Sequence, residues 1–178
     1  MAEAQGAAIS SARVTVDGGG QANVATGIPP LDHLVALIAR YACFDVALDV
    51  APGPDEAEVA AAGRALGEAL HRPLRADAVR GYGSAALPAD EALAHVALEV
   101  SERPRLVANV DLSQSRVGGV GTDVVAGFLR ELAAGAGLTL HVRLIGGEDA
   151  QHVLEAIFKT LGVALAQACR SRRREEAG

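Results

Sequence analysis

The chain has 178 residues, with 16 Lys and Arg against 22 Asp and Glu, which gives a formal net charge of −6 at pH 7. This balance argues against a nucleic-acid-binding protein, which would need a basic face. Half of the residues are hydrophobic but only 3% are aromatic, so we expect a single domain over residues 1–178 with a core of Val, Leu, Ile and Ala.

The ends of the chain and the cysteines indicate a cytoplasmic protein. No apolar run reaches the roughly 18 residues of a membrane span, and the first six residues lack the features of a signal peptide. Cys43 and Cys169 have no CxxC spacing and are expected to be buried free thiols. The Arg-rich segment 170–176 is expected to be a solvated C-terminus, because Glu175 and Glu176 offset its charge.

The first half of the chain predicts strands and helices in the order strand, strand, helix, strand, helix. Apolar and polar residues alternate in residues 12–17 and 44–50, as in strands. Apolar side chains recur at helical spacing in residues 31–40 and 55–70.

Turn and capping residues support these bounds. Residues 18–20 are three glycines, which we expect to form a hairpin turn. Pro29 suits the first position of a helix, Asp55 is expected as the N-cap of the next helix, and Pro73 ends that helix. The junction between the two halves is expected at residues 75–90.

The second half repeats the order of the first. Residues 94–100 and 139–145 alternate like strands, and residues 126–133 and 150–165 have helical spacing. The sequence therefore predicts an α+β fold with two duplicated halves, at about residues 10–75 and 90–170. Each half would be a small sheet backed by two helices, and the halves would pack together.

The repeat is clearest in the last helix of each half. Gly67-Glu68-Ala69-Leu70 corresponds to Gly162-Val163-Ala164-Leu165, 95 residues later, and the same offset places residues 44–50 on residues 139–145. In this register His152 corresponds to Ala57 and Glu155 to Ala60. Only one of the two helices has kept polar side chains that could bind a metal ion.

Those polar side chains lie on one flank of the last helix. Gln151, His152 and Glu155 are three and four residues apart and fall off the apolar stripe. Imidazole nitrogen and carboxylate oxygen are ligands for Mn, Fe or Zn, and His33 and His141 are further candidates. By itself, a His-x-x-Glu on a helix is more often a surface ion pair.

Five segments resemble, in order and spacing, the imidazoleglycerol-phosphate dehydratase family, whose enzymes act in histidine biosynthesis. The segments are Thr26-Gly27-Ile28-x-x-Leu31-Asp32-His33, Asp90-Glu91-Ala92-Leu93-Ala94, Ser101-x-Arg103-Pro104, Ala136-Gly137-Leu138-Thr139-Leu140-His141 and His152-x-x-Glu155-Ala156-x-Phe158-Lys159. The resemblance covers about residues 10–170. It implies two similar α+β halves and a 24-subunit cage.

The resemblance also implies a metal site. The family's enzymes bind two manganese ions at subunit interfaces, through a His-His-x-x-Glu on the second helix of each half and one histidine each from the Leu-Asp-His and Thr-Leu-His motifs. His33, His141, His152 and Glu155 match four of these eight ligands. Manganese binding is therefore expected to be weakened or lost.

The other four implied ligands are missing. Gln151 replaces one histidine of the second half, and the first-half motif falls on residues 56–60, where Ala57 and Ala60 stand. Glu56 is a candidate replacement ligand in a rearranged site. A Glu-His pair that the family has after residues 122–123 is Ala126-Gly127 here.

The resemblance assigns fewer groups to the substrate. Arg80 and Arg103 correspond to phosphate contacts, and Asp90 corresponds to a further substrate contact. No catalytic residue is assigned.

Three functions are consistent with this sequence. The protein is an impaired dehydratase relative that serves as a structural or regulatory subunit, or an active lyase with a remodelled site, or a protein that binds a phosphorylated or imidazole ligand without turnover. A homo-oligomer, up to the 24-subunit cage, is the expected assembly. Co-assembly with a complete dehydratase, which would supply missing ligands in trans, is an alternative.

Overall fold

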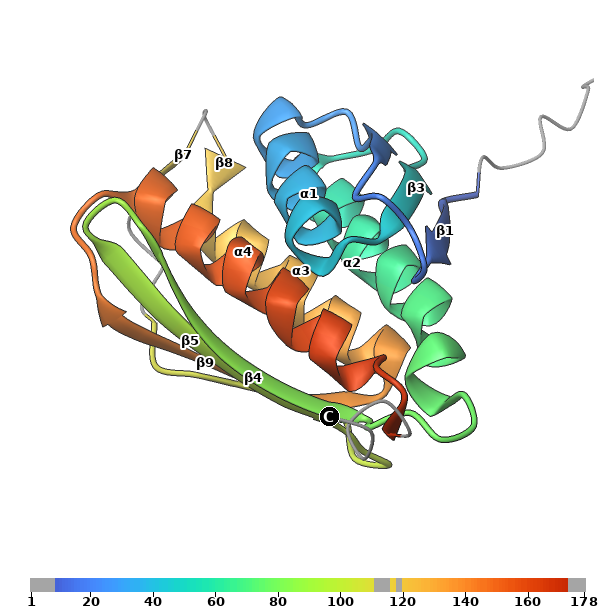
Figure 1. Ribbon diagram of the computed structural model, residues 1–178. Coiled ribbons are helices and arrows are strands. Elements are labelled where there is room, and N and C mark those ends of the chain that lie inside the picture. The colour runs from blue at the N-terminus through green and yellow to red at the C-terminus, as the bar shows by residue number, and fades with distance from the viewer. Residues whose placement is uncertain (1–8, 111–115, 118–119, 173–178) are drawn as a thin grey trace, which may run out of the picture.

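In the computed structural model, which describes residues 9–110, 116–117 and 120–172, four α-helices lie between two β-sheets (Figure 1). A larger sheet forms one outer layer and a smaller sheet forms the other. The helices between them are apolar on the sides that face one another and the sheets, and together they form one core.

The smaller sheet and its helices come from the first half of the chain. Its strands are β1 (Ser11–Thr15), β2 (Ala22–Ala25) and β3 (Asp45–Asp49), in the order β1-β3-β2. The strand β1 is antiparallel to β3, and β2 is parallel to it. The helices α1 (Pro29–Ala42) and α2 (Asp55–His71) follow β2 and β3, and a short 3-10 turn, Pro73–Arg75, comes after α2.

The larger sheet repeats this pairing with one extra strand. Its strands are β4 (Tyr82–Ala89), β5 (Ala92–Val100), β6 (Arg105–Ala108) and β9 (Leu138–Gly146), in the order β4-β5-β9-β6. Here β5 is antiparallel to β9, and β6 is parallel to it. Two short strands, β7 (Arg116–Val117) and β8 (Val120–Gly121), precede α3 (Thr122–Ala136), and α4 (Ala150–Ala168) ends the described fold.

The expected α+β fold with two similar halves is therefore confirmed. In both halves the central strand alternates buried and exposed residues, as in buried Val46 and Leu48 around exposed Ala47. One face of each sheet is thus covered by helices, and the other is left open. No helix in the described part of the chain is long and apolar enough to cross a membrane.

Two glycines set the distance between paired helices. A Cβ atom on Gly67 of α2 would lie 2.5 Å from the carbonyl oxygen of Leu132 in α3. A Cβ on Gly162 of α4 would lie 2.7 Å from the carbonyl oxygen of Ile38 in α1. Any side chain at these positions would collide with backbone, so both close contacts require glycine. The pairs α2–α3 and α4–α1 are therefore equivalent.

This equivalence corrects the predicted alignment of the strands. Equivalent positions in α2 and α4 are 95 residues apart in the sequence, as predicted. Ile38 of α1 and Leu132 of α3, which are also equivalent, are 94 residues apart. Cys43 (φ 56°) and Gly137 (φ 69°), the left-handed residues just before β3 and β9, also lie 94 apart. The predicted offset of 95 for residues 44–50 was wrong by one, because it matched buried Val46 with exposed His141. A one-residue slip inverts the faces of a strand.

Several local predictions also need correction. The glycines at residues 18–20 do not form a hairpin, because β1 and β2 both pair with β3 and not with each other. The N-cap of α2 is Pro54, and Asp55 is the first helical residue. The strand β4 lies inside the segment that was expected to be a junction. Cys43 is exposed and Cys169 is half-buried, so Cys43 is not the buried thiol we expected.

Candidate functional site

The first part of the candidate site lies where α1 and α4 meet. His33 Nε2 is 3.1 Å from Glu155 Oε1, and their side chains are 55% and 21% exposed. Gln151 Nε2 donates a hydrogen bond to the same Glu155 oxygen, at 3.2 Å. Three of the polar residues singled out in the sequence therefore meet at one point.

The start of α1 is held so that His33 faces α4. The Thr26 backbone N–H donates to Asp32 Oδ1 at 3.0 Å, and the Thr26 hydroxyl also bonds that oxygen. The Ile28 N–H in turn donates to the Thr26 hydroxyl. Pro29 stands at the first helical position, as predicted, where its fixed φ suits a helix. The Thr-Gly-Ile segment and Asp32 thus fix the first turn of the helix that carries His33.

His152 belongs to a different cluster. Its Nδ1 lies 2.7 Å from Glu91 Oε2, and its Nε2 lies 3.3 Å from Asp90 Oδ2. The other Glu91 oxygen accepts hydrogen bonds from the backbone N–H groups of Glu148 and Asp149, at 3.2 and 2.8 Å. The tip of the β4–β5 hairpin is thereby fastened to the start of α4.

The charges in this cluster shift the ionisation of both partners. Backbone hydrogen bonding from Asp149, followed by the His152 ring, lowers the pKa of Glu91 to about 2. The hydrogen bond to Glu91 raises the pKa of His152. The pair therefore favours a carboxylate beside an imidazolium.

Asp149 is the N-cap of α4. Its Oδ1 accepts hydrogen bonds from the N–H groups of Gln151, at 2.9 Å, and His152, at 3.1 Å. Two otherwise unpaired donors of the first turn are thereby satisfied. The cap fixes the first turn of α4, which carries His152.

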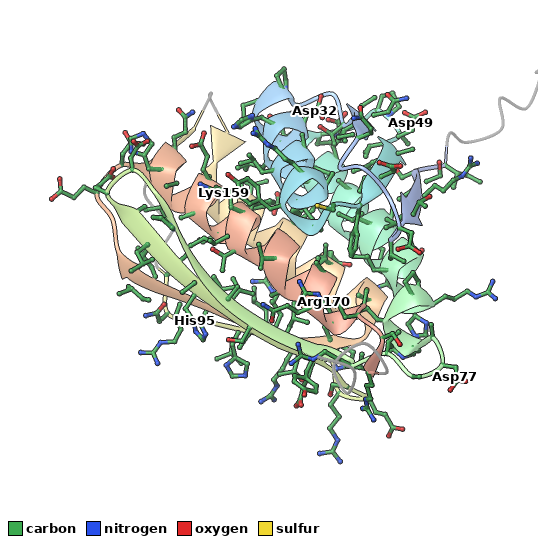
Figure 2. The ribbon with its side chains drawn as sticks, in the orientation of Figure 1. Asp32, Asp49, Asp77, His95, Lys159 and Arg170 are labelled. Atoms are coloured by element: carbon green, nitrogen blue, oxygen red, sulfur yellow. The ribbon has the colours of Figure 1, made fainter. Side chains whose placement is uncertain are left out.

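His141 lies apart from both clusters. It points to the open face of the larger sheet, opposite Ala97 of β5, and lines a shallow pocket of about 310 Å³ with Tyr82 and Ser84. His95 lies on the same face (Figure 2), and Ser84 Oγ is 2.8 Å from its Nε2. Because α4 covers the other face, one chain does not bring His141 to His33 or Glu155.

The α2–α3 contact has no equivalent of the His33–Glu155 pair. Gly127 of α3 is the equivalent of His33, at an offset of 94 residues in the sequence. Ala60 of α2 is the equivalent of Glu155, at an offset of 95. A Cβ on Gly127 would meet no atom within 4 Å, so packing does not require glycine there. Glu56 and Ala57, one turn earlier on α2, are exposed. Neither a histidine nor a carboxylate stands at the two equivalent positions.

The candidate substrate residues are divided between the two ends of the larger sheet. Arg80 precedes β4 and Arg103 follows β5, so both lie at one end. Asp90 lies in the turn at the other end, and the 8 residues of β4 between them span roughly 26 Å. The three residues therefore do not meet within one chain.

The C-terminal segment lies beside Arg80. The Arg80 N–H donates to the carbonyl oxygen of Arg170, and Arg172 Nη2 lies 3.4 Å from the carbonyl oxygen of Arg80. Arg170 lies where α4 ends (Figure 2). The Arg80 guanidinium also lies 4.5 Å from the centre of the Tyr82 ring. Residues 173–176 of the expected solvated tail lie outside the described residues.

The residues of one chain do not fit two manganese ions. Within residues 9–110, 116–117 and 120–172, no group of three or more His, Cys, Asp or Glu side chains is arranged to hold a metal ion. His33 and Glu155 offer two donor atoms at one point, and the Gln151 amide oxygen could become a third. An octahedral ion such as Mn²⁺ takes about six ligands, so this set is a partial site for one ion.

Sequence reasoning missed Glu91 as a site residue. It lies within the Asp90-Glu91-Ala92 segment, but nothing local shows that this turn reaches a residue 61 positions away. A polar pair at a hairpin turn is ordinary turn chemistry. Only the packing of β4 and β5 against α4 brings Glu91 to His152.

Comparison with known proteins agrees with these motifs. The family model described as imidazoleglycerol-phosphate dehydratase matches residues 26–165. A relative of that name from Acetivibrio thermocellus is 40% identical over an alignment of 163 residues, and the alignment covers 88% of this chain and 83% of the relative. Another from Syntrophobacter fumaroxidans is 42% identical, with 89% and 83% covered.

Solved structures give the same result. The imidazoleglycerol-phosphate dehydratase of Staphylococcus aureus superimposes with a TM-score of 0.83 at 30% identity, covering 91% of this chain and 94% of that chain. The Pyrococcus furiosus protein, in complex with (S)-C348, gives 0.78 at 27% identity, with 91% and 89% covered. The chain belongs to the imidazoleglycerol-phosphate dehydratase family.

Proposed function

We propose that this protein keeps the fold of its family without the two-metal dehydration, and that it acts in the cytoplasm as a structural or regulatory subunit of an oligomer. The family reaction is a lyase step of histidine biosynthesis, in which imidazoleglycerol phosphate loses water. Metal ions in such a site act as Lewis acids and orient the substrate. The proposal therefore depends on which ligands the chain has kept.

The replacement of both partners at the α2–α3 contact carries the proposal. His33 and Glu155 face each other at the α1–α4 contact, whereas Gly127 and Ala60 occupy the equivalent positions. Removing a group that merely supports a metal ligand typically costs 10- to 100-fold in affinity or activity. Loss of the ligands that the resemblance implies on α2, and of one more at Gln151 on α4, is expected to cost more than that.

A remodelled lyase with one metal ion is the second candidate. It is favoured by the convergence of His33, Glu155 and Gln151 at one point of the surface. In this case His33→Ala and Glu155→Gln should each abolish both metal retention and turnover. His71→Ala and Glu102→Gln, which make the same changes at exposed positions outside this site, are the matched controls.

The decisive experiment is a dehydratase assay on untagged protein with imidazoleglycerol phosphate and added Mn²⁺, together with elemental analysis. The Acetivibrio thermocellus relative serves as the positive control. We expect no turnover and less than one metal ion per chain. Turnover comparable to the control would overturn the proposal. A substrate-induced rise of the melting temperature without turnover would instead favour a binding protein that uses Arg80 and Arg103.

Native mass measurement tests the proposed assembly. We expect a homo-oligomer, up to the 24 subunits of the family's cage. If the protein regulates or completes a dehydratase, co-expression with a complete relative should give mixed oligomers. Strict segregation into two homogeneous assemblies would rule out completion of sites in trans.

A further inference from the structure

We propose that Glu91 is the positioning residue for His152, and that it separates this histidine from the His33–Glu155 pair. A His-x-x-Glu spacing suggests that His152 and Glu155 serve one centre. The geometry assigns them to two. This inference concerns the orientation of a ring and holds whether or not the protein turns over a substrate.

Both oxygens of the Glu91 carboxylate are used. Oε1 accepts from the backbone N–H groups of Glu148 and Asp149, and Oε2 lies 2.7 Å from His152 Nδ1. Rotation of the carboxylate would break contacts at both ends. An isolated ion pair between exposed side chains is held loosely, but here two of the three donors belong to the backbone. The position of Glu91 is therefore fixed by the loop before α4.

The hydrogen bond to Glu91 decides which nitrogen of His152 is available. With the proton on Nδ1 donated to Glu91, the free lone pair of the neutral ring is on Nε2, which lies 3.3 Å from Asp90 Oδ2. A carboxylate that binds one imidazole nitrogen fixes the tautomer and the direction of the other. Any cation that binds His152 would thus bind at Nε2 beside Asp90.

Glu91 also controls where the ring is placed along α4. The Asp149 N–H that it holds belongs to the residue that caps this helix, through hydrogen bonds to the N–H groups of Gln151 and His152. The hairpin lies close against this loop, since a Cβ on Gly147 would be 3.0 Å from Ala92 Cβ. Backbone and ring are therefore positioned by the same carboxylate.

The tautomers of the five histidines provide a direct test. Long-range ¹H–¹⁵N spectra at alkaline pH, where the rings are neutral, should show the His152 ring protonated on Nδ1, with His152→Asn used for assignment. Protonation on Nε2 in the unmodified protein would overturn the proposal. This measurement needs no variant at position 91, so it does not depend on whether such a variant folds.

Variants then test the role of Glu91 itself. Glu91→Gln should change the His152 signals and leave those of His33, His71, His95 and His141 in place. Glu148→Gln, which removes a neighbouring negative charge, is the matched control and should change none. Unchanged His152 signals in Glu91→Gln would refute the positioning role.

A double-mutant cycle separates positioning from general loss of stability. If Glu91 acts on His152, the effects of Glu91→Gln and His152→Gln on the melting temperature should be clearly non-additive. Additive effects would mean that the two residues act independently and would contradict the proposal. Dehydratase activity in the unmodified protein would overturn the proposed function and leave this inference untouched.

Discussion

His33 Nε2 and Glu155 Oε1 lie 3.1 Å apart although 122 positions separate the two residues in the chain. The contact exists because α1 and α4 are brought together by Gly162 against the backbone of Ile38. The equivalent contact between α2 and α3 has the same backbone arrangement, with Gly67 against Leu132. In the α2–α3 contact, Gly127 stands at the position equivalent to His33 and Ala60 at the position equivalent to Glu155.

Restoring this second pair should create a metal site. The backbone contact is conserved between the halves and there is room for a side chain at Gly127, so Ala60→Glu with Gly127→His should place a carboxylate near an imidazole. We expect Mn²⁺ or Zn²⁺ affinity to rise by on the order of 10-fold, measured by calorimetric titration. Gly127→Ala with Ala60→Gln is the control. Equal affinity in both double variants would show that the two contacts are not equivalent.

The interhelical glycines should be sensitive to the smallest side chain. Gly67→Ala and Gly162→Ala each force a Cβ against a carbonyl oxygen, and overpacking of this kind costs about 1–3 kcal/mol. Gly127→Ala, in open space within α3, should instead stabilise the protein by about 0.5–1 kcal/mol, because alanine is the better helix residue. Urea denaturation of the three variants measures these changes. A neutral Gly162→Ala would contradict the close approach of α1 and α4.

The Glu91 cluster should contribute stability that is lost in acid. The pKa of Glu91 is lowered from 4.5 to about 2 in the folded protein, so its contribution is fully present above pH 4.5 and is lost as pH falls towards 2. Glu91→Gln should therefore be less stable than the unmodified protein at neutral pH, with the difference shrinking towards pH 2. Melting temperatures across this range provide the measurement. A difference that stays constant with pH would contradict the ionised contact.

The two thiols should differ in reactivity. Cys43 is exposed, whereas burial raises the pKa of the Cys169 thiol to about 11. Because the thiolate is the nucleophile, an alkylating reagent at pH 8 should add one group quickly, at Cys43. The second group should appear only slowly or after unfolding. Mass spectrometry follows both additions, and Cys43→Ser should lack the fast one.

The sequence predicted the helices and the duplication well, since each helix has a long apolar stripe and the glycines repeat. It placed the strands one residue out of register, because the 95-residue offset of the helices was carried over to the strands. The second half has one residue more between Gly137 and Gly162 than the first half has between Cys43 and Gly67. The strand β4 was missed because Gly83 and Pro88 weaken its strand pattern. Its partner β5 has no such interruption and was found.

The sequence named candidate ligands but did not show which of them lie together. Helical spacing placed Gln151, His152 and Glu155 on one flank, which is true, yet His152 turns to Glu91 on the hairpin. That contact depends on how the larger sheet packs against α4. Local periodicity holds no information about it. The pairing of His33 with Glu155 likewise follows from helix packing alone.

The first turns of α2 and α4 and the remainder of these helices perform separate tasks. The outward-facing positions of these first turns are exposed or half-buried, so their side chains can be exchanged without disturbing the interior; they are Glu56, Ala57, Ala60, Gln151, His152 and Glu155. Gly67 and Gly162 lie further along, where the helices touch. Mutations can therefore remove the polar side chains of one helix while the residues that pack the helices remain under selection. A gene with this architecture can drift into a new role, or be returned to the old one, through a handful of surface changes.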